Sequence, residues 1–147
     1  MRLPYENASS GQRAIAEIEK LLRQFGCSRF GVMTDYSTGS VVCQFEYRGR
    51  AVSINASYQG YAALWLKNNP TSRRSRTTTA QRHEIAKRKG EMAVPSILRD
   101  YIKGQIMVIE AGLVSFEGAF LAHMLLPNGQ RVLDKAQSVL QLEGPDQ

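Results

Sequence analysis

The chain has 147 residues, 43% of them hydrophobic and 22% charged, so it is long enough to bury a core and too apolar to be disordered throughout. Its formal net charge of +6 favours polyanionic partners such as nucleic acid, nucleotides or an acidic membrane surface, with solubility alone as the other explanation. No apolar run is long enough to cross a bilayer and no secretory signal is visible at the N-terminus. We therefore expect one cytoplasmic domain over residues 1–147, with no membrane partner.

The first half of the chain predicts a helix followed by a sheet. After an extended lead-in (residues 1–10), apolar positions spaced for one helical face predict a helix over residues 11–25, capped by Ser9 or Ser10 and ended by Gly26. Alternating apolar residues then predict strands over 29–36, 41–47 and 50–56, joined by short turns. This pattern indicates a three-stranded antiparallel meander that packs helices on one face and leaves the other partly open.

The second half predicts helices. Ser57 is placed to cap a helix over residues 58–68, a loop follows over residues 70–79, and one of Thr77, Thr78 or Thr79 is placed to cap the next helix. Gly90 and Pro95 predict a kink or a break before a core helix that ends at Ala111. A short helix from Ser115 to Met124, a weaker helix over 132–140 and a tail over 141–147 complete an α+β fold with several helices packed on the sheet.

Positive charge is concentrated in residues 70–89, which carry seven Lys or Arg side chains and one acid. Loop arginines can reach phosphates, and neighbouring Ser and Thr hydroxyls add donors, although a solvated helix face and loop would show the same composition. The predicted phosphate contacts are Arg73, Arg74, Arg76, Arg82, Lys87, Arg88 and Lys89, with Arg48 and Arg50 beside a turn as secondary contacts. Trp65, the only tryptophan, is interpreted either as a core residue or as a base-stacking residue.

No recognised catalytic, metal-binding or phosphate-loop motif occurs in the sequence. His83 and His123 stand apart from metal-type spacings, and His123 is interpreted as a partly buried structural imidazole. Cys27 and Cys43 have neither metal nor redox spacing and are interpreted as buried thiols, with a disulfide left open. The sequence therefore predicts no catalytic residue, no metal and no cofactor, and favours a binding protein over an enzyme.

Several stretches resemble a family of small proteins of unassigned activity that bacteriophages and prophages encode. The similarity lies in residues 16–26, in residues 42–54 around Arg48-Gly49-Arg50, and above all in residues 109–132, with their Glu-Ala-Gly, Phe-Glu, Phe-Leu-Ala-His and Leu-Pro-Asn-Gly order. The resemblance implies a phage context and an α+β organisation, and it implies no activity. Relatives lack a proline at the position of Pro95, so the similarity leaves the continuity of the helix open.

Two functional hypotheses follow. The first is a phage-type protein that binds nucleic acid, in single-strand handling or recombination, by neutralising phosphates with the basic stretch. The alternative is a counter-defence protein that sequesters a nucleotide signal or blocks a host protein. A homo-oligomer and a host protein are further partners that the sequence leaves open, and the host cytoplasm is the expected location. A small phosphoryl-transfer or hydrolytic enzyme has no supporting motif.

Overall fold

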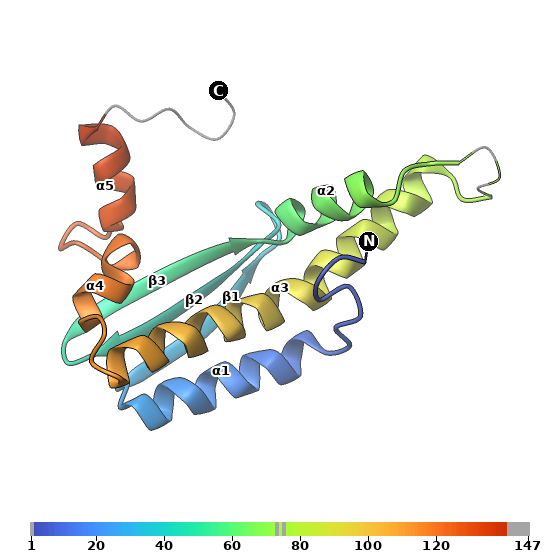
Figure 1. Cartoon of the computed structure of the whole chain (residues 1–147). Coiled ribbons are helices and arrows are strands. Elements are labelled where there is room, and N and C mark those ends of the chain that lie inside the picture. Colours follow the sequence, from blue (N-terminus) through green and yellow to red (C-terminus); the bar gives the residue numbers. More distant parts are fainter. Residues whose placement is uncertain (1, 73, 75, 141–147) are drawn as a thin grey trace.

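The computed structural model describes residues 2–72, 74 and 76–140. Its elements, in chain order, are α1 (Gly11–Phe25), β1 (Arg29–Asp35), β2 (Ser40–Tyr47), β3 (Arg50–Ser57), α2 (Tyr58–Asn68), α3 (Thr79–Glu110), α4 (Phe116–Phe120), the 3-10 helix η1 (Leu121–His123) and α5 (Val132–Val139). The three strands form one antiparallel sheet in the order β1-β2-β3 (Figure 1). The α+β class, the meander and the helices that follow it are confirmed.

Helix starts are set by the serine and threonine caps that the sequence predicts. The side chains of Ser10, Ser57, Thr78 and Ser115 each accept a hydrogen bond from a backbone N–H in the first turn of the helix that follows. Such a bond satisfies one of the amide groups that a helix N-terminus leaves free. Gly26, at φ 107°, ends α1 in the left-handed conformation that glycine adopts without strain.

The sheet buries one face and exposes the other. Register pairs Val32 with Cys43 and Cys43 with Ile54, so alternate residues of all three strands share the side on which α1 and α3 lie (Figure 1). Met33 and Asn55 belong to the opposite side and are exposed. One face is packed and the other is partly open, as predicted: Ser53 lies on the same side as Asn55 and is buried.

Helix α3 runs without a break for 32 residues, so of the kink or break that was predicted at Gly90 and Pro95 the break is wrong. Gly90 lies where the start of α2 crosses α3: a Cβ at this position would overlap the carbonyl oxygen of Tyr58 and lie 3.2 Å from its carbonyl carbon. Pro95 is fully buried under the first turn of α1, where a Cβ on Gly11 would lie 3.3 Å from the proline ring. Both residues are therefore packing positions within one helix.

A helical hairpin, which we call the arm, extends beyond the sheet (Figure 1). It consists of α2, the connecting residues 69–78 and residues 79–90 of α3. The described residues of the lead-in, predicted to be extended, instead turn at residues 4–7 and pack along the base of the arm. The Tyr61 hydroxyl donates to the Pro4 carbonyl at 2.6 Å, and Leu3 is buried. The arm is thereby fixed to the body of the protein.

The opposite end of the molecule is built by the C-terminal segments. The short helix expected to reach Met124 ends at Phe120, and the chain continues as η1 before Met124 bridges to Val52 on the free edge of β3. The Leu125 amide donates to the Ala51 carbonyl at 2.9 Å. Helix α5 follows and has no buried residue. This segment covers part of a sheet edge that would otherwise present unpaired backbone groups.

The contact at Gly90 makes a stability prediction. Gly90→Ala should lower the free energy of unfolding by about 1–3 kcal/mol, because the added methyl forces α2 away from α3. Gly104→Ala is the matched control: Gly104 lies on the exposed side of the same helix, and a Cβ added there would have no atom within 4 Å, so alanine should raise stability by about 0.5–1 kcal/mol. Urea denaturation followed by circular dichroism measures both. Equal effects of the two substitutions would contradict the packed crossing.

Candidate nucleic-acid interface

We call the described residues that connect α2 to α3, between Asn69 and Thr78, the tip of the arm. Hydrogen bonds anchor the tip at both of its ends. The Thr78 side chain accepts from the Gln81 amide at 3.1 Å while the Gln81 side chain accepts from the Thr78 amide at 2.8 Å, a reciprocal cap that fixes the start of α3. The Arg82 guanidinium donates to the Asn69 carbonyl across the hairpin. The end of α2 and the start of α3 are therefore fixed by hydrogen bonds at Asn69 and Thr78.

Arg74 and Arg76 lie between these points and are exposed. Neither forms an ion pair with another residue that the structure describes. Thr71 and Ser72, also exposed, bring hydroxyl groups to the same segment. Arg73 lies outside the described residues. Exposed, uncompensated guanidinium groups at the end of a projecting hairpin are suited to bidentate contact with phosphate oxygens.

The helix residues of the basic stretch divide into two groups. Lys87 and Arg88 are exposed, Arg88 with Glu84 at 4.0 Å one turn away. Arg82 and Lys89 are half-buried and bonded internally, because the Lys89 ammonium donates to the Glu6 carbonyl at 3.2 Å. These two residues hold the arm together. Fewer cations of the arm are therefore exposed than the sequence predicts.

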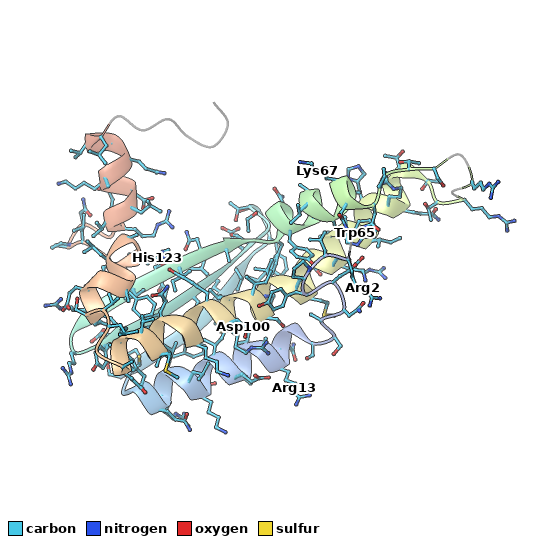
Figure 2. All side chains as sticks on the ribbon, viewed as in Figure 1. Arg2, Arg13, Trp65, Lys67, Asp100 and His123 are labelled. Atoms are coloured by element: carbon cyan, nitrogen blue, oxygen red, sulfur yellow. The ribbon has the colours of Figure 1, made fainter. Side chains whose placement is uncertain are left out.

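Lys67 is an exposed cation of the arm that was not among the predicted contacts (Figure 2). It occupies the last turn of α2, three residues before the basic stretch begins. The sequence could have indicated Lys67 as a contact, because it lies at the end of a predicted helix that leads directly into the basic loop.

Arg48 and Arg50 lie at the opposite end of the sheet, in and after the β2–β3 turn, and do not join the arm. The Arg48 guanidinium lies 5.1 Å from the centre of the Tyr47 ring, a cation–π arrangement. Arg50 forms an ion pair with Glu117 of α4. Those predicted contacts that the structure describes therefore do not form one continuous surface.

Trp65 serves the packing of the arm. Its indole N–H donates to the Glu6 carboxylate at 3.0 Å, and its side chain is half-buried (Figure 2). The Glu6 backbone carbonyl meanwhile accepts from Lys89. One lead-in residue thus binds both helices of the arm, and this arrangement supports the packing interpretation of Trp65 over the stacking one.

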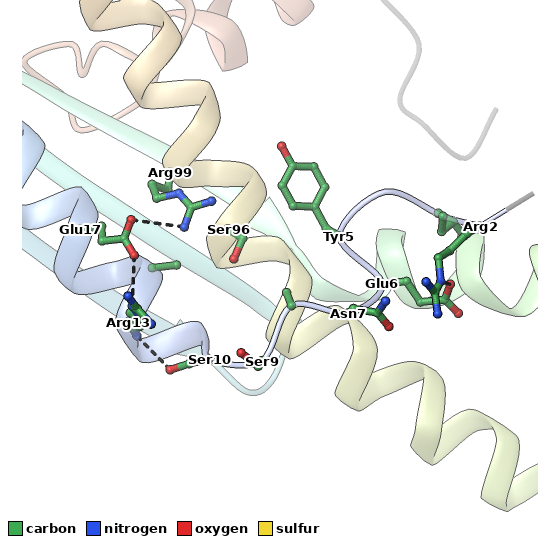
Figure 3. Close-up of a pocket in the computed structure, with 13 residues that line it drawn as sticks. Arg2, Tyr5, Glu6, Asn7, Ser9, Ser10, Arg13, Glu17, Ser96 and Arg99 are labelled. Carbon is green, nitrogen blue, oxygen red and sulfur yellow. Dashed lines mark hydrogen bonds and ion pairs between the residues drawn. The ribbon is translucent and has the colours of Figure 1, made fainter.

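A cavity of about 540 Å³ lies between the lead-in, α1 and α3 (Figure 3). Its cations are already paired: Glu17 lies 3.7 Å from Arg13 and 3.3 Å from Arg99, and Arg99 lies 3.0 Å from Asp100. Hydrogen bonds from Arg99 and from the Tyr5 hydroxyl lower the pKa of Asp100. This network has little charge left for an anion and holds the lead-in against the helices.

Another cavity, of about 700 Å³, lies at the base of the arm, between the β1–β2 turn, α2 and α3. Tyr36, Tyr58, His83, Lys87 and Glu91 are among the residues that line it. These residues could not be grouped from the sequence, because they come from three elements that only the fold places side by side.

No group of three or more His, Cys, Asp or Glu side chains in the described part of the chain is arranged to hold a metal ion. Cys27 and Cys43 are free thiols, Cys43 buried and Cys27 half-buried. Burial raises the pKa of Cys27 to about 11 and that of Cys43 to about 12. Both thiols are thus held in the protonated form, which is a poor nucleophile.

His123 has a structural role, as predicted. It is half-buried beside Tyr101, with its Nε2 3.3 Å from the tyrosine hydroxyl and its buried Nδ1 without a hydrogen-bond partner among the described residues. Burial, and then the nearby charge of Arg131, lower the pKa of His123 below its ordinary 6.5. The folded protein therefore favours the neutral imidazole.

This shift predicts a pH dependence of stability. Below pH 6.5 the unfolded chain takes up a proton at His123 more readily than the folded protein, so the free energy of unfolding should fall as the pH drops from 7.5 to 5. His123→Gln should flatten that dependence. Urea midpoints across this pH range measure it. A slope that His123→Gln leaves unchanged would contradict the assignment.

None of the described helices is both long and apolar enough to span a membrane. Comparison of the chain with protein-family models, with curated proteins and with solved structures finds no match. The resemblance to small phage proteins therefore stays a prediction, and the geometry of the arm carries the functional argument.

Proposed function

We propose that this chain is a non-enzymatic nucleic-acid-binding protein whose arm contacts the phosphate backbone. The observation that supports it most is the placement of Arg74 and Arg76, exposed and without ion pairs among the described residues, at the end of a hairpin that projects beyond the sheet. Lys67, Lys87 and Arg88 extend the positive charge along both helices of the arm.

The proposed mechanism is phosphate neutralisation. Guanidinium groups displace counterions from the phosphate backbone, and hydroxyl and amide donors of the tip add hydrogen bonds. The body of the protein fixes the arm through Tyr61, Trp65 and Lys89, so little conformational entropy is lost at the base of the arm on binding. Contacts of this kind position a protein on a nucleic acid without reading its sequence.

A nucleotide-sequestering protein is the second candidate, favoured by the cavity of about 700 Å³ beside Lys87. That volume lies within the range of small-ligand sites. The two candidates differ in salt dependence, because a strand contacts several cations at once and a single nucleotide contacts few. The hypothetical biological setting is phage recombination for the nucleic-acid-binding protein and phage counter-defence for the nucleotide-sequestering protein.

The tip arginines give the direct test. Arg74→Ala with Arg76→Ala should weaken binding of a single-stranded oligonucleotide and reduce the slope of log affinity against log salt by about 1.4, the value for two lost phosphate contacts. Fluorescence anisotropy at several salt concentrations measures the slope. The control is Arg23→Ala with Arg29→Ala, which removes the same charge from exposed positions outside the arm.

The control variant should bind as the wild type does, apart from a small general effect of net charge. Equal losses in the two double variants would mean that net charge alone drives binding. Absence of binding to single- and double-stranded DNA and RNA at low salt would exclude the proposed function.

A further inference from the structure

The cavity at the base of the arm is built from three separate parts of the chain. The end of β1 at residues 34–35, with Tyr36 and Gly39 of the β1–β2 turn, forms one side. Helix α2 contributes a second, and the face of α3 that carries His83, Lys87 and Glu91 forms the third. Its volume of about 700 Å³ is large enough for a ligand of nucleotide size.

One part of this cavity suits a flat, apolar ring. Ala62, Ala63 and Leu66 of α2 line it with small and aliphatic side chains, and Tyr58 lies half-buried beside them. Tyr36 stands at the turn with 92% of its surface exposed. An aromatic ring left almost wholly in water next to an apolar cavity is available to stack on a ligand ring.

On the α3 side of the cavity, polar residues follow one another along one face of the helix. His83 and Lys87 are one turn apart, and Glu91 follows one turn further from the tip. Lys87 forms no ion pair within the described part of the chain. The Asp35 carboxylate also lines the cavity. Hydrogen bonds from the Ser37 hydroxyl and from the Ser37 and Thr38 amides lower the pKa of Asp35, so it keeps its negative charge. An unpaired ammonium beside an apolar wall matches a phosphate attached to a planar base.

We propose that this cavity binds one nucleoside phosphate, with the base between Tyr36 and the α2 wall and the phosphate on Lys87. The inference rests on the proposed function where the nucleotide belongs to a strand. Lys87 lies about 12 Å along α3 from Thr79, the first residue of the helix, and a span of this length holds roughly three to four stacked nucleotides. A paired base would first have to leave the double helix, so the cavity makes the protein selective for single strands.

The experiment measures affinity for three probes: a labelled 12-nucleotide deoxyadenosine strand, the same strand annealed to its complement, and adenosine monophosphate. Anisotropy gives the affinities of the strands, and calorimetry gives that of the mononucleotide. The cavity variants are Tyr36→Ala, which changes a side chain that is 92% exposed and so spares the fold, and Ala63→Trp, which fills the cavity from α2. Lys103→Ala, an exposed lysine of α3 outside the cavity, is the control.

The wild type should bind the single strand at least about tenfold more tightly than the duplex, because loss of one stacked base costs roughly that much or more. Both cavity variants should weaken single-strand binding about tenfold and leave duplex binding unchanged, whereas loss of the tip arginines should weaken both. A defect in adenosine monophosphate binding in the cavity variants, without single-strand selectivity, would support the same cavity with a free nucleotide as its ligand.

The cavity proposal is overturned if Tyr36→Ala and Ala63→Trp match Lys103→Ala with every probe. That result would leave the proposed function of the arm intact, provided the tip variant still loses affinity. Conversely, an unaffected tip variant together with a defective Tyr36→Ala variant would exclude Arg74 and Arg76 as the strand contact and retain the cavity.

Discussion

The crossing of α2 over α3 at Gly90 is the constraint on which the rest of the structure depends. Only a residue without a side chain lets the Tyr58 carbonyl come this close to the helix. The crossing directs α2 back along the N-terminal part of α3, and the resulting hairpin continues past the end of the sheet. It therefore determines both that an arm exists and where its basic tip lies. The cavity at the base of the arm depends on the same contact, since its walls are the helices that meet there and the turn that faces them.

The two ends of the molecule differ in how far their cations are paired with carboxylates. At the arm, exposed cations lack carboxylate partners among the described residues at Arg74, Arg76 and Lys87. At the other end, Arg50 pairs with Glu117, and Arg131 with Asp134 at 2.8 Å. An ion pair with a carboxylate lowers the positive charge that a basic residue offers to a phosphate. The cations that stay free are those on which a phosphate-binding account depends: Arg74 and Arg76 lie on the loop that joins α2 to α3, and Lys87 lies on α3 itself.

Local rules predicted much of the fold, and long-range contacts explain what they missed. Each helix cap at Ser10, Ser57, Thr78 and Ser115 follows from a hydroxyl beside the first turn, which sequence shows directly. Glycine and proline are unfavourable inside a helix, so Gly90 and Pro95 predict a break when α3 is considered alone. The residues against which they pack, Tyr58 and Gly11, lie far away in sequence. The sequence shows the basic stretch directly, but the internal roles of Arg82 and Lys89 depend on Asn69 and on Glu6. The cavity was invisible because its residues come from three separate elements.

Hydrogen exchange in the presence of a single-stranded oligonucleotide tests the central claim, that the arm is the nucleic-acid contact, most directly. Protection should increase in peptides that cover the arm, residues 58–90, and in the β1–β2 turn beside Tyr36. Exchange should stay unchanged on the open face of the sheet around Asn55 and in α5. Protection confined to the open sheet face or to α5, with the arm unaffected, would contradict the claim.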